Sequence, residues 1–428
     1  MLNKLKKLFK TGFFHIFGSR VLNKVINFVS SAVLVRILDK GDYGIFTYAW
    51  NIYSIVLLFS GLGMEYGVLH LCSEFYEDEK KSNAIGNFAT KFGVAFDLLL
   101  AVVILVIGLF VPLKIEQAGF LLCLMCLLPL FNLLFNLTTV RLRAVRKNQA
   151  FSTLSTFNTA AVFGVSVVGA LLFKEKGLVL GYYVAFLLSV LVGFTVYKVR
   201  LYNRNAAPLE KKTRKDILSI SFVSMMNNGL SHLISLLGVF VLGIIVPDEE
   251  ILASYKVATL IPTALSFIPV ALVTYLYPYF TQHREDGTWC LKQYKRILLG
   301  LGGFNLALSL FLCLLAPWLV PFLFGNQYTD AVLVFQLLSI NYFLAGTFRV
   351  LAGNLLVTAR KLKFNLFVAV ISGTLNIIAD VIFISLWGSI GAAIATLAVV
   401  VVTGTLNTGY LIYTYRSWKK AQLTAPQE

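Results

Sequence analysis

Apolar runs of about twenty or more residues follow one another along almost the whole chain, and they restrict the fold more than any other feature. About twenty residues suffice for a helix to cross the hydrocarbon of a bilayer, at about 1.5 Å per residue. Only 13% of the 428 residues are charged, whereas about a quarter is usual in soluble domains. The twelve runs lie near residues 11–38, 43–71, 84–111, 118–140, 150–173, 177–200, 217–246, 251–281, 297–316, 330–357, 364–387 and 389–415. We therefore predict an all-α integral membrane protein with about twelve transmembrane helices.

The loops between the runs differ sharply in charge. Alternate loops and both ends of the chain hold nearly all of the loop lysines and arginines, whereas the remaining loops hold only Lys40, Lys114, Lys174 and Lys176. Because cytoplasmic loops are enriched in Lys and Arg, this bias predicts that the N and C termini are both cytoplasmic. The net charge of +17 then indicates contact with anionic membrane lipids and not with nucleic acid.

A polar interruption at residues 202–216 falls near the middle of the chain and predicts a cytoplasmic linker between two halves. The loop AVRKNQ of the first half has a counterpart, TARKLK, in the second half. The second half opens, like the first, with a polar stripe at steps of three and four, made of Ser221, Ser224, Asn228, Ser231 and Ser235. We therefore predict two pseudo-symmetric six-helix bundles, residues 1–201 and 217–416, followed by a cytoplasmic tail at 417–428. Two similar halves are typical of transporters.

The first apolar run carries two cations, Arg20 and Lys24, well inside its length. With Asn23 and Asn27 they recur at steps of three and four, so the four side chains share one face of a helix. A cation at the centre of a spanning helix costs about 2.5–3.5 kcal/mol on insertion scales, which disfavours contact with lipid. We expect this face to line a water-filled cavity and to bind an anionic cargo.

Further candidates for the substrate-binding set lie in later runs: Asn228 in the seventh, Lys256 in the eighth and Arg349 in the tenth. Amide and hydroxyl groups of the first and seventh runs could form hydrogen bonds with the cargo, while the basic side chains bind its anionic groups. Each residue has a plainer alternative. Asn228 could only join helices to one another, and Lys256 could extend to the membrane surface.

Three acidic residues, Glu65, Asp97 and Asp380, lie inside apolar runs. Buried carboxylates are the usual carriers of a coupling proton or sodium ion in transporters, so these residues are candidates for coupling transport to H⁺ or Na⁺. The alternative is that they are charge partners of a nearby cation, such as Arg20 or Lys24, and only fix helix packing. His232, beside the polar stripe of the seventh run, is expected to form an interhelical hydrogen bond.

Motifs for other chemistry are missing from the sequence. Cys123 and Cys126 form a CxxC pair inside an apolar run, with no second pair and no nearby histidine, which disfavours a metal or redox site. No Walker A loop for ATP and no His/Glu metal spacing occur. The basic start of the chain is not followed by a small-residue cleavage site, so we expect the first helix to be retained. We therefore predict no enzyme activity, no metal and no cofactor apart from a coupling ion.

The chain contains, in this order, the stretches VRILDKGDYGIF, FSGLGMEY, SYKVATLIP, FLFGNQYTDAV and LNIIADVIFISLWGSIGAAIATL. In order and spacing they resemble the polysaccharide flippases, the Wzx-type O-antigen and capsule exporters of the MOP superfamily. The resemblance implies translocation of an undecaprenyl-pyrophosphate-linked oligosaccharide to the outer leaflet of the bacterial inner membrane by alternating access. It also implies a glycan polymerase and a chain-length regulator of lipopolysaccharide or capsule synthesis as candidate partners.

Two related groups of that superfamily remain as alternatives. MATE-type multidrug antiporters tend to carry an acidic residue in the first span, whereas this chain has Arg20 and Lys24 there. Lipid II flippases resemble the chain in having cations on the first and eighth spans, but they usually have fourteen spans. A membrane-embedded glycan polymerase or ligase would need a large outer loop for its chemistry, and the predicted outer loops are short.

Overall fold

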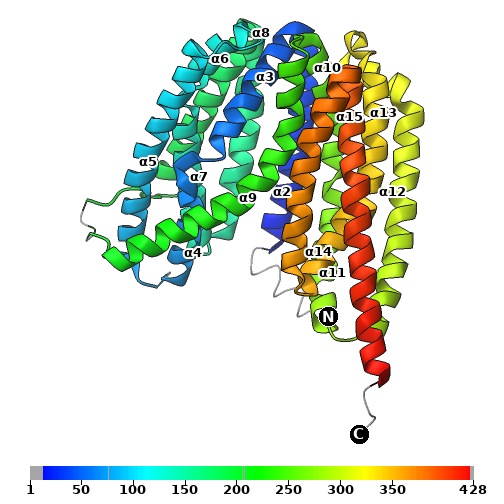
Figure 1. Cartoon of the computed structure of the whole chain (residues 1–428). Helices are drawn as coiled ribbons and strands as arrows, with labels where there is room; N and C mark the ends of the chain where they lie inside the picture. Colours follow the sequence, from blue (N-terminus) through cyan, green and yellow to red (C-terminus); the bar gives the residue numbers. More distant parts are fainter. Residues whose placement is uncertain (1–12, 76, 205, 207, 425–428) are drawn as a thin grey trace. The chain divides into compact units, whose positions relative to one another are not determined.

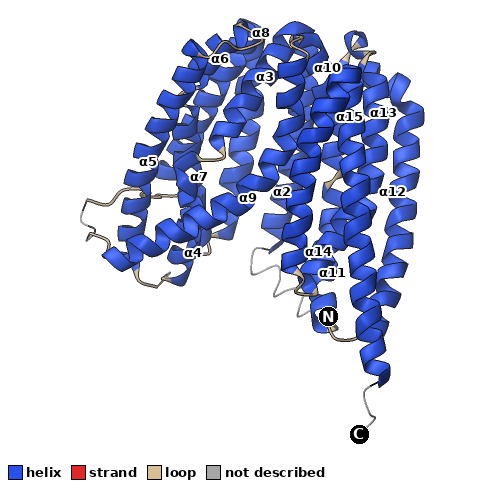
Figure 2. Ribbon diagram, viewed as in Figure 1, coloured by secondary structure: helices blue, strands red, loops and turns tan. Residues whose placement is uncertain are grey.

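The computed structural model describes residues 13–75, 77–204, 206 and 208–424. Within these residues every regular element is a helix and none is a strand (Figure 2), so the all-α prediction is confirmed. The chain divides into two compact units, Met1–Leu236 (unit 1) and Leu237–Glu428 (unit 2). This division falls inside a helix, after the linker that we predict at residues 202–216, and the predicted linker stays a prediction.

Unit 1 is a helical bundle in which α2 packs against α8, α4 against α7, and α5 against both α6 and α7 (Figure 1). Its second span consists of two helices separated by a short 3₁₀ turn. Its elements are α2 (Phe13–Ile37), α3 (Lys40–Leu57), η1 (Ser60–Gly63), α4 (Met64–Glu74), α5 (Glu79–Phe110), α6 (Gln117–Met125), α7 (Leu128–Ala144), α8 (Asn148–Thr195) and the first part of α9 (Lys211–Ile245).

Unit 2 is a second helical bundle, in which α13 packs against α10, α12 and α15, and α14 packs against α11 and α15. A π-helical segment interrupts its fourth span. Its elements are the end of α9, α10 (Glu249–Leu265), α11 (Phe267–Gln282), α12 (Gly287–Phe324), η2 (Asn326–Tyr328), α13 (Ala331–Leu344), η3 (Ala345–Val350), α14 (Leu351–Thr358) and α15 (Leu362–Thr424).

The described residues contain eight helical stretches that are long and apolar enough to cross a membrane. Two of them contain a kink, at Phe173–Lys174 in α8 and at Trp387–Gly388 in α15, which divides each into two passes. Two further helices, α2 with 25 residues and α9 with 35, are long enough to span but more polar, because they carry the predicted polar stripes. The described part of the chain therefore has twelve helical passes, as the sequence predicts.

The two units repeat the same backbone geometry at matching points. Phe173 and Lys174 have φ/ψ of −136°/22° and 52°/−134°, and Trp387 and Gly388 have −135°/15° and 56°/−131°. Left-handed residues also end the fourth span of each unit, Arg146 with φ 59° and Arg360 with φ 57°. Lys174 and Gly388 are as far apart in the sequence as Arg146 and Arg360. The predicted pseudo-symmetry of the two halves is therefore confirmed at the level of the backbone.

Lys174 adopts a backbone conformation that usually requires glycine, the residue at the equivalent position of unit 2. Its ammonium group forms two ion pairs, 2.8 Å from Asp39 Oδ2 and 2.9 Å from Asp42 Oδ2. The hydrogen bond and the charge of Lys174 hold the pKa of the exposed Asp39 carboxyl below its ordinary value. The turn in α8 is thereby tied to the start of α3.

Glycine lets the two limbs of α8 approach each other at backbone distance. A Cβ added to Gly169 would overlap the carbonyl oxygen of Gly177, and a Cβ added to Gly177 would overlap that of Gly169. One turn further along, a Cβ on Gly181 would lie 2.6 Å from Ser166 Cα. Small residues at such crossings give close van der Waals packing, which is the main attraction between helices in a membrane.

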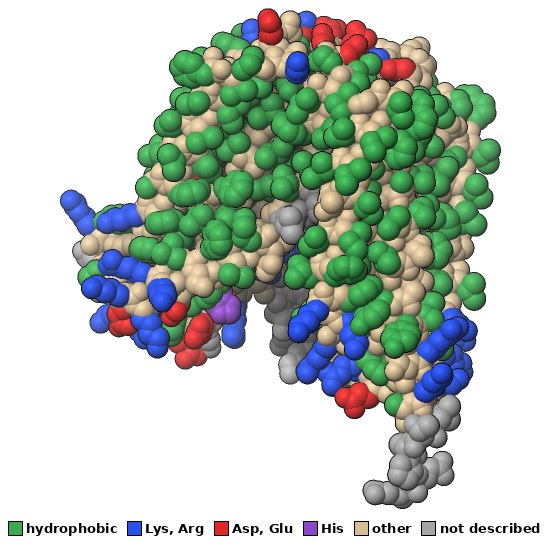
Figure 3. Space-filling view, viewed as in Figure 1, with side chains coloured by type: hydrophobic (Ala, Val, Ile, Leu, Met, Phe, Trp, Pro, Cys, Tyr) green, Lys and Arg blue, Asp and Glu red, His purple; other side chains and the backbone are tan. Residues whose placement is uncertain are grey.

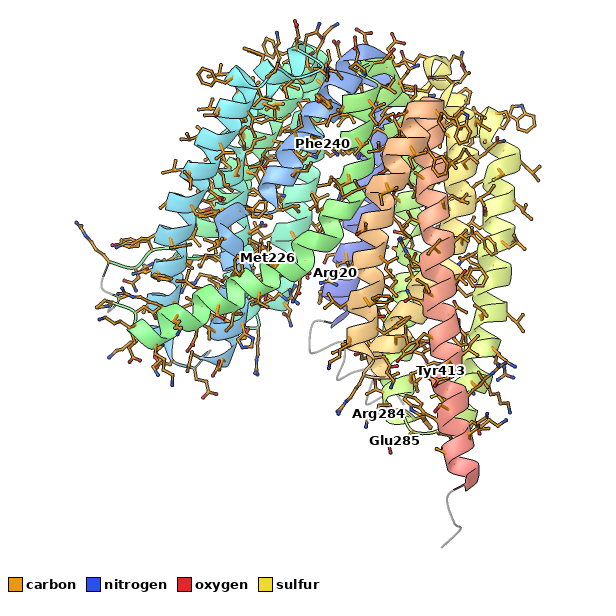
Figure 4. All side chains as sticks on the ribbon, in the orientation of Figure 1. Arg20, Met226, Phe240, Arg284, Glu285 and Tyr413 are labelled. Atoms are coloured by element: carbon orange, nitrogen blue, oxygen red, sulfur yellow. The ribbon has the colours of Figure 1, made fainter. Side chains whose placement is uncertain are left out.

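Lysine and arginine side chains gather near one end of the helices in each unit, and hydrophobic side chains cover the lengths between the ends (Figure 3). In unit 2 this charged end includes Arg284, whose Nη2 lies 2.9 Å from Glu285 Oε1 (Figure 4). The lysines up to Lys10 that contribute to the charge bias lie outside the described residues. The cytoplasmic placement of both termini stays a prediction.

Replacing Gly177 by valine is expected to separate the two limbs of α8, because the new side chain would occupy the position of the Gly169 carbonyl. Overpacking of this kind costs about 1–3 kcal/mol. We expect a clear decrease in the thermal unfolding temperature of the purified protein in detergent. Gly164→Val is the matched control, because nothing lies within 4 Å of a Cβ at that glycine of the same helix. Equal unfolding temperatures for the two variants would contradict the close contact.

Candidate functional site

The second span of unit 1 is interrupted halfway. After α3 ends at Leu57, three consecutive residues, Gly61, Leu62 and Gly63, have positive φ angles of 53°, 48° and 72°, and α4 begins at Met64. Two glycines make this left-handed segment accessible, whereas Leu62 occupies it at a conformational cost. A break inside a span exposes backbone groups that need new hydrogen-bond partners, and breaks of this kind commonly lie at binding sites of transporters.

Asp97 of α5 accepts hydrogen bonds from groups that are exposed at this break. The residue is 0% exposed. Its Oδ1 accepts a hydrogen bond of 2.6 Å from the Gly61 backbone N–H, and its Oδ2 accepts one of 2.9 Å from the Ser60 hydroxyl. The carboxylate therefore caps the interrupted helix, and each of its oxygens is engaged.

A pocket of about 180 Å³ opens beside the break, within unit 1. Its polar lining comes from three places in the fold: the break and the start of α4, the middle of α7, and α9. These side chains are Ser60, Glu65, Tyr66, Asn132, Asn136, Asn228 and His232. Apolar side chains of Leu57, Leu58, Leu133 and Met225 complete the wall, and none of the lining residues is lysine or arginine.

Three amide side chains line this pocket. Asn132 and Asn136 are half-buried one turn apart on α7, and among the described residues their side chains have no hydrogen-bond partner. Asn228 is exposed, and its Nδ2 donates 2.8 Å to the Ser224 carbonyl of its own helix, which leaves its Oδ1 available as an acceptor. The pocket thus presents several donors and acceptors, with one carboxylate at Glu65.

The predicted cationic face of α2 is a second feature of unit 1 (Figure 4). Arg20, Lys24 and Asn27 are exposed, and Asn23 on the same side donates 3.1 Å from Nδ2 to Ser155 Oγ of α8. At 3.6 residues per turn, the exposed apolar side chains of α2 lie on the opposite side; they are Leu22, Val25 and Val29, between 41% and 53% exposed. Polar and apolar exposed surfaces of α2 are therefore separated.

Neither Arg20 nor Lys24 forms an ion pair with a carboxylate of the described residues. The alternative, that Arg20 or Lys24 pairs with Glu65 or Asp97, is not seen among the described residues. The Asp97 oxygens accept hydrogen bonds from Gly61 and Ser60 instead.

Unit 2 contains a buried carboxylate of a different kind. Asp380 on α15 is 0% exposed, and neither of its oxygens has a hydrogen-bond partner among the described residues. Asn376, one turn earlier, also has an unpartnered buried Oδ1. A Cβ on Gly238 would lie 3.9 Å from Asp380 Oδ2 and 3.7 Å from the Tyr255 hydroxyl, so both groups approach the same point of α9. The predicted cation Lys256 follows Tyr255 and is half-buried.

Arg349 lies in the π-helical segment of unit 2 and is half-buried. A buried network holds this segment against α12: Asn305 Oδ1 accepts 2.9 Å from the Tyr342 hydroxyl, and Asn305 Nδ2 donates 3.2 Å to Thr347 Oγ1. An extra residue in a helical turn changes the direction of the side chains that follow it, and π-helical turns are frequent at functional sites. The network therefore holds the segment that carries Arg349 against α12.

The structure brings together only part of the predicted site. Glu65 and Asn228 line one pocket, and Asp97 lies directly behind it through Ser60. Arg20, Lys24, Asn23 and Asn27 are on α2 and do not line that pocket, while Lys256, Arg349 and Asp380 belong to unit 2. The side chains of Ser231 and Ser235 in the predicted stripe lie outside the described residues. No group of three or more His, Cys, Asp or Glu side chains in the described residues is arranged to hold a metal ion.

Sequence reasoning missed four polar residues of the pocket, namely Ser60, Tyr66, Asn132 and Asn136. A usable signal was present at the last two, which are four residues apart inside the otherwise apolar stretch FNLLFNL. Single amides in spanning helices usually join helices to one another. In the sequence, an asparagine that binds a ligand therefore looks the same as one that only joins helices.

A family model described as "Polysaccharide biosynthesis protein" matches residues 33–333 of the chain. No curated protein matches it. A solved structure described as an inward-facing conformation of a multidrug resistance MATE family transporter of the MOP superfamily is similar, with a TM-score of 0.72 and 13% identity, over 94% of this chain and 96% of that one. Lipid II flippase MurJ in an inward closed conformation gives a TM-score of 0.73 and 14% identity, over 96% of this chain and 90% of that one.

A third similar structure is a MOP superfamily transporter from Pyrococcus furiosus, described by a reverse polarity of its binding pocket. It gives a TM-score of 0.57 and 13% identity, over 95% of this chain and 96% of that one. At these identities the likeness shows the fold alone. The predicted all-α membrane fold, with twelve helices in two similar halves, is therefore the fold of these transporters, and the chain is a multi-pass membrane protein.

Asp97→Ala is expected to destabilise the break in the second span, because it leaves the Gly61 N–H and the Ser60 hydroxyl without their acceptor in a buried place. Hydrogen bonds to a charged group contribute about 1.5–3 kcal/mol each. We expect a large decrease in the thermal unfolding temperature of the purified protein. Asp97→Asn should retain much of the stability, since its amide oxygen can still accept from Gly61. Unfolding of Asp97→Ala at the wild-type temperature would show that the cap is dispensable.

Proposed function

The chain belongs to the polysaccharide biosynthesis protein family, and on that premise we propose that it is a lipid-linked oligosaccharide flippase. It moves an undecaprenyl-pyrophosphate-linked glycan from the cytoplasmic to the outer leaflet of the bacterial inner membrane by alternating access. It acts as a transporter and not as an enzyme, with a glycan polymerase and a chain-length regulator as downstream partners. The family match and the shared transporter fold support this reading.

The observation that carries the proposal is the polar face of α2. Two cations there, Arg20 and Lys24, have no carboxylate partner among the described residues and lie opposite the apolar exposed side of the helix. Each costs about 2.5–3.5 kcal/mol in a span, so a ligand that offsets this cost should be anionic. A pyrophosphate fits, because the guanidinium binds phosphate oxygens through paired donors and the ammonium binds as a point charge.

The two alternatives on the same fold differ in their cargo. A cationic drug would be repelled by Arg20 and Lys24, so the charge of α2 argues against a MATE-type antiporter. A lipid II flippase would use the same pyrophosphate chemistry, and only the glycan of the cargo separates it from the proposed function.

We also propose that transport is coupled to an ion gradient. Asp380 is the strongest candidate for the residue that binds the coupling ion. Its two oxygens and the nearby Asn376 Oδ1 are buried without partners among the described residues. A proton or Na⁺ would supply what these oxygens lack, because an uncompensated buried carboxylate is costly. Asp97 is a weaker candidate, since Gly61 and Ser60 already occupy its oxygens. Glu65 in the pocket stays the third candidate.

Arg20→Ala combined with Lys24→Ala should abolish surface glycan in a flippase-deficient strain that depends on this protein. Loss of two charge-assisted contacts of about 1.5–3 kcal/mol each lowers the transport rate about 100-fold or more. Arg20→Lys combined with Lys24→Arg should restore transport in part, because both charges return. The control is Lys211→Ala combined with Lys212→Ala, which removes two exposed cations at the start of α9. Full surface glycan from a normally inserted Arg20/Lys24 double variant would refute the anion site.

Asp380→Asn should uncouple transport from the ion gradient. In proteoliposomes, we expect wild-type flipping of the lipid-linked glycan to accelerate under either a Na⁺ gradient or a proton gradient, and the variant to lose that acceleration. Asp97→Asn is the comparison, and it should keep the gradient dependence because its carboxyl group has a structural role. If Asp380→Asn responds to the gradient as the wild type does, the coupling site lies elsewhere.

A further inference from the structure

The pocket beside the break of the second span takes no part in the anion site, and of its lining residues only Glu65 is a candidate for ion coupling. Resting on the proposed function, we propose that it is the subsite that recognises one uncharged sugar of the cargo, through its hydroxyl or acetamido groups. The pyrophosphate would bind the α2 cations, and the glycan would be selected separately in unit 1.

The hydrogen-bonding groups of the pocket suit a sugar. Asn132 and Asn136 point from adjacent turns of α7 and have no partner among the described residues. An amide offers donors and an acceptor in one plane, so it can bind neighbouring sugar hydroxyls at once. The Asn228 amide and the Tyr66 hydroxyl add groups from two other helices. Buried or half-buried polar groups without partners are costly, and a polyhydroxylated ligand would satisfy them.

The charge of the pocket decides which sugars it takes. Its lining contains Glu65 and neither lysine nor arginine. A carboxylate within such a pocket repels phosphate and the carboxylate of a uronic acid, while it accepts hydrogen bonds from neutral sugars. The phosphate-binding and sugar-binding functions would therefore be separated by the sign of charge on two surfaces of unit 1.

The size of the pocket suits a single sugar ring. Its volume of about 180 Å³ is below the roughly 300–1,000 Å³ of pockets that enclose drug-sized ligands. Leu57, Leu58, Leu133 and Met225 provide apolar surface against which the C–H face of a ring can pack. The wall is preorganised, because Asp97 fixes the break and a Cβ on Gly61 would lie 2.6 Å from Leu133 Cδ1. Preorganised groups lower the entropic cost of binding.

The test measures binding to the full chain in lipid nanodiscs with three probes. They are undecaprenyl pyrophosphate bearing one N-acetylglucosamine, the same carrier bearing one glucuronic acid, and the bare carrier. We expect the wild type to bind the N-acetylglucosamine form about 10-fold more tightly than the other two, as two or three net hydrogen bonds would give. If the wild type binds all three probes equally, the pocket does not select a sugar and the inference is wrong.

Asn132→Ala combined with Asn136→Ala should remove the preference for N-acetylglucosamine and leave the affinity for the bare carrier unchanged. Glu65→Gln should raise the affinity for the glucuronic acid form about 10-fold, because it removes the repulsion. Asn354→Ala is the matched control: this exposed amide donates 2.8 Å to the carbonyl one turn earlier on its own helix, as Asn228 does, but lies in unit 2. A double variant that keeps the wild-type preference would show that the sugar is selected elsewhere, and the inference would be wrong.

Failure of the proposed function can be told apart from failure of this inference. Free N-acetylglucosamine, followed by saturation-transfer NMR, reports on the pocket without any pyrophosphate. If the bare carrier does not bind but the free sugar binds and is lost in the Asn132/Asn136 double variant, the proposed cargo is wrong and the sugar subsite stands. If the carrier binds through Arg20 and Lys24 while the free sugar shows no transfer, the subsite is wrong and the flippase proposal stands.

Discussion

A helix that is interrupted inside a bilayer must find other partners for the backbone groups that the interruption exposes, because lipid tails offer none. In unit 1 that partner is Asp97, whose carboxylate accepts from Gly61 at 2.6 Å and from Ser60 at 2.9 Å. The third span thereby fixes the conformation of the second. Ser60 and Glu65 line a pocket beside this break, so the geometry of the pocket depends on the two hydrogen bonds to Asp97.

Most of the fold could be predicted from sequence because the bilayer permits so few alternatives. Run lengths and loop charges predicted twelve passes, and the turns at Phe173–Lys174 and Trp387–Gly388 lie where one predicted run ends and the next has not yet begun. The break in the second span was not predicted, because its residues read as part of one continuous apolar run. FSGLGMEY contains the glycines that permit a left-handed backbone, but glycine is also common in unbroken spanning helices.

The features of the site that depend on a single helix could be predicted from the sequence. Those that depend on packing between helices could not. Spacing placed Arg20 and Lys24 on one face of α2, because helical periodicity is a property of the segment itself. The meeting of Asn132 with Glu65 and Asn228 depends on three helices from distant parts of the sequence. The sequence also marked both Asp97 and Asp380 as buried acids. Only packing distinguishes the first, with both oxygens hydrogen-bonded, from the second, with neither.

The glycine contacts in α8 have a mechanical consequence. Because Gly169 and Gly177 meet backbone to backbone, no side chain lies between the two limbs that could change its rotamer and let them slide. The turn itself is fastened by Lys174 to Asp39 and Asp42. The fifth and sixth passes are thus coupled into one stiff lever. Flexing during a transport cycle must therefore be absorbed outside this pair of passes.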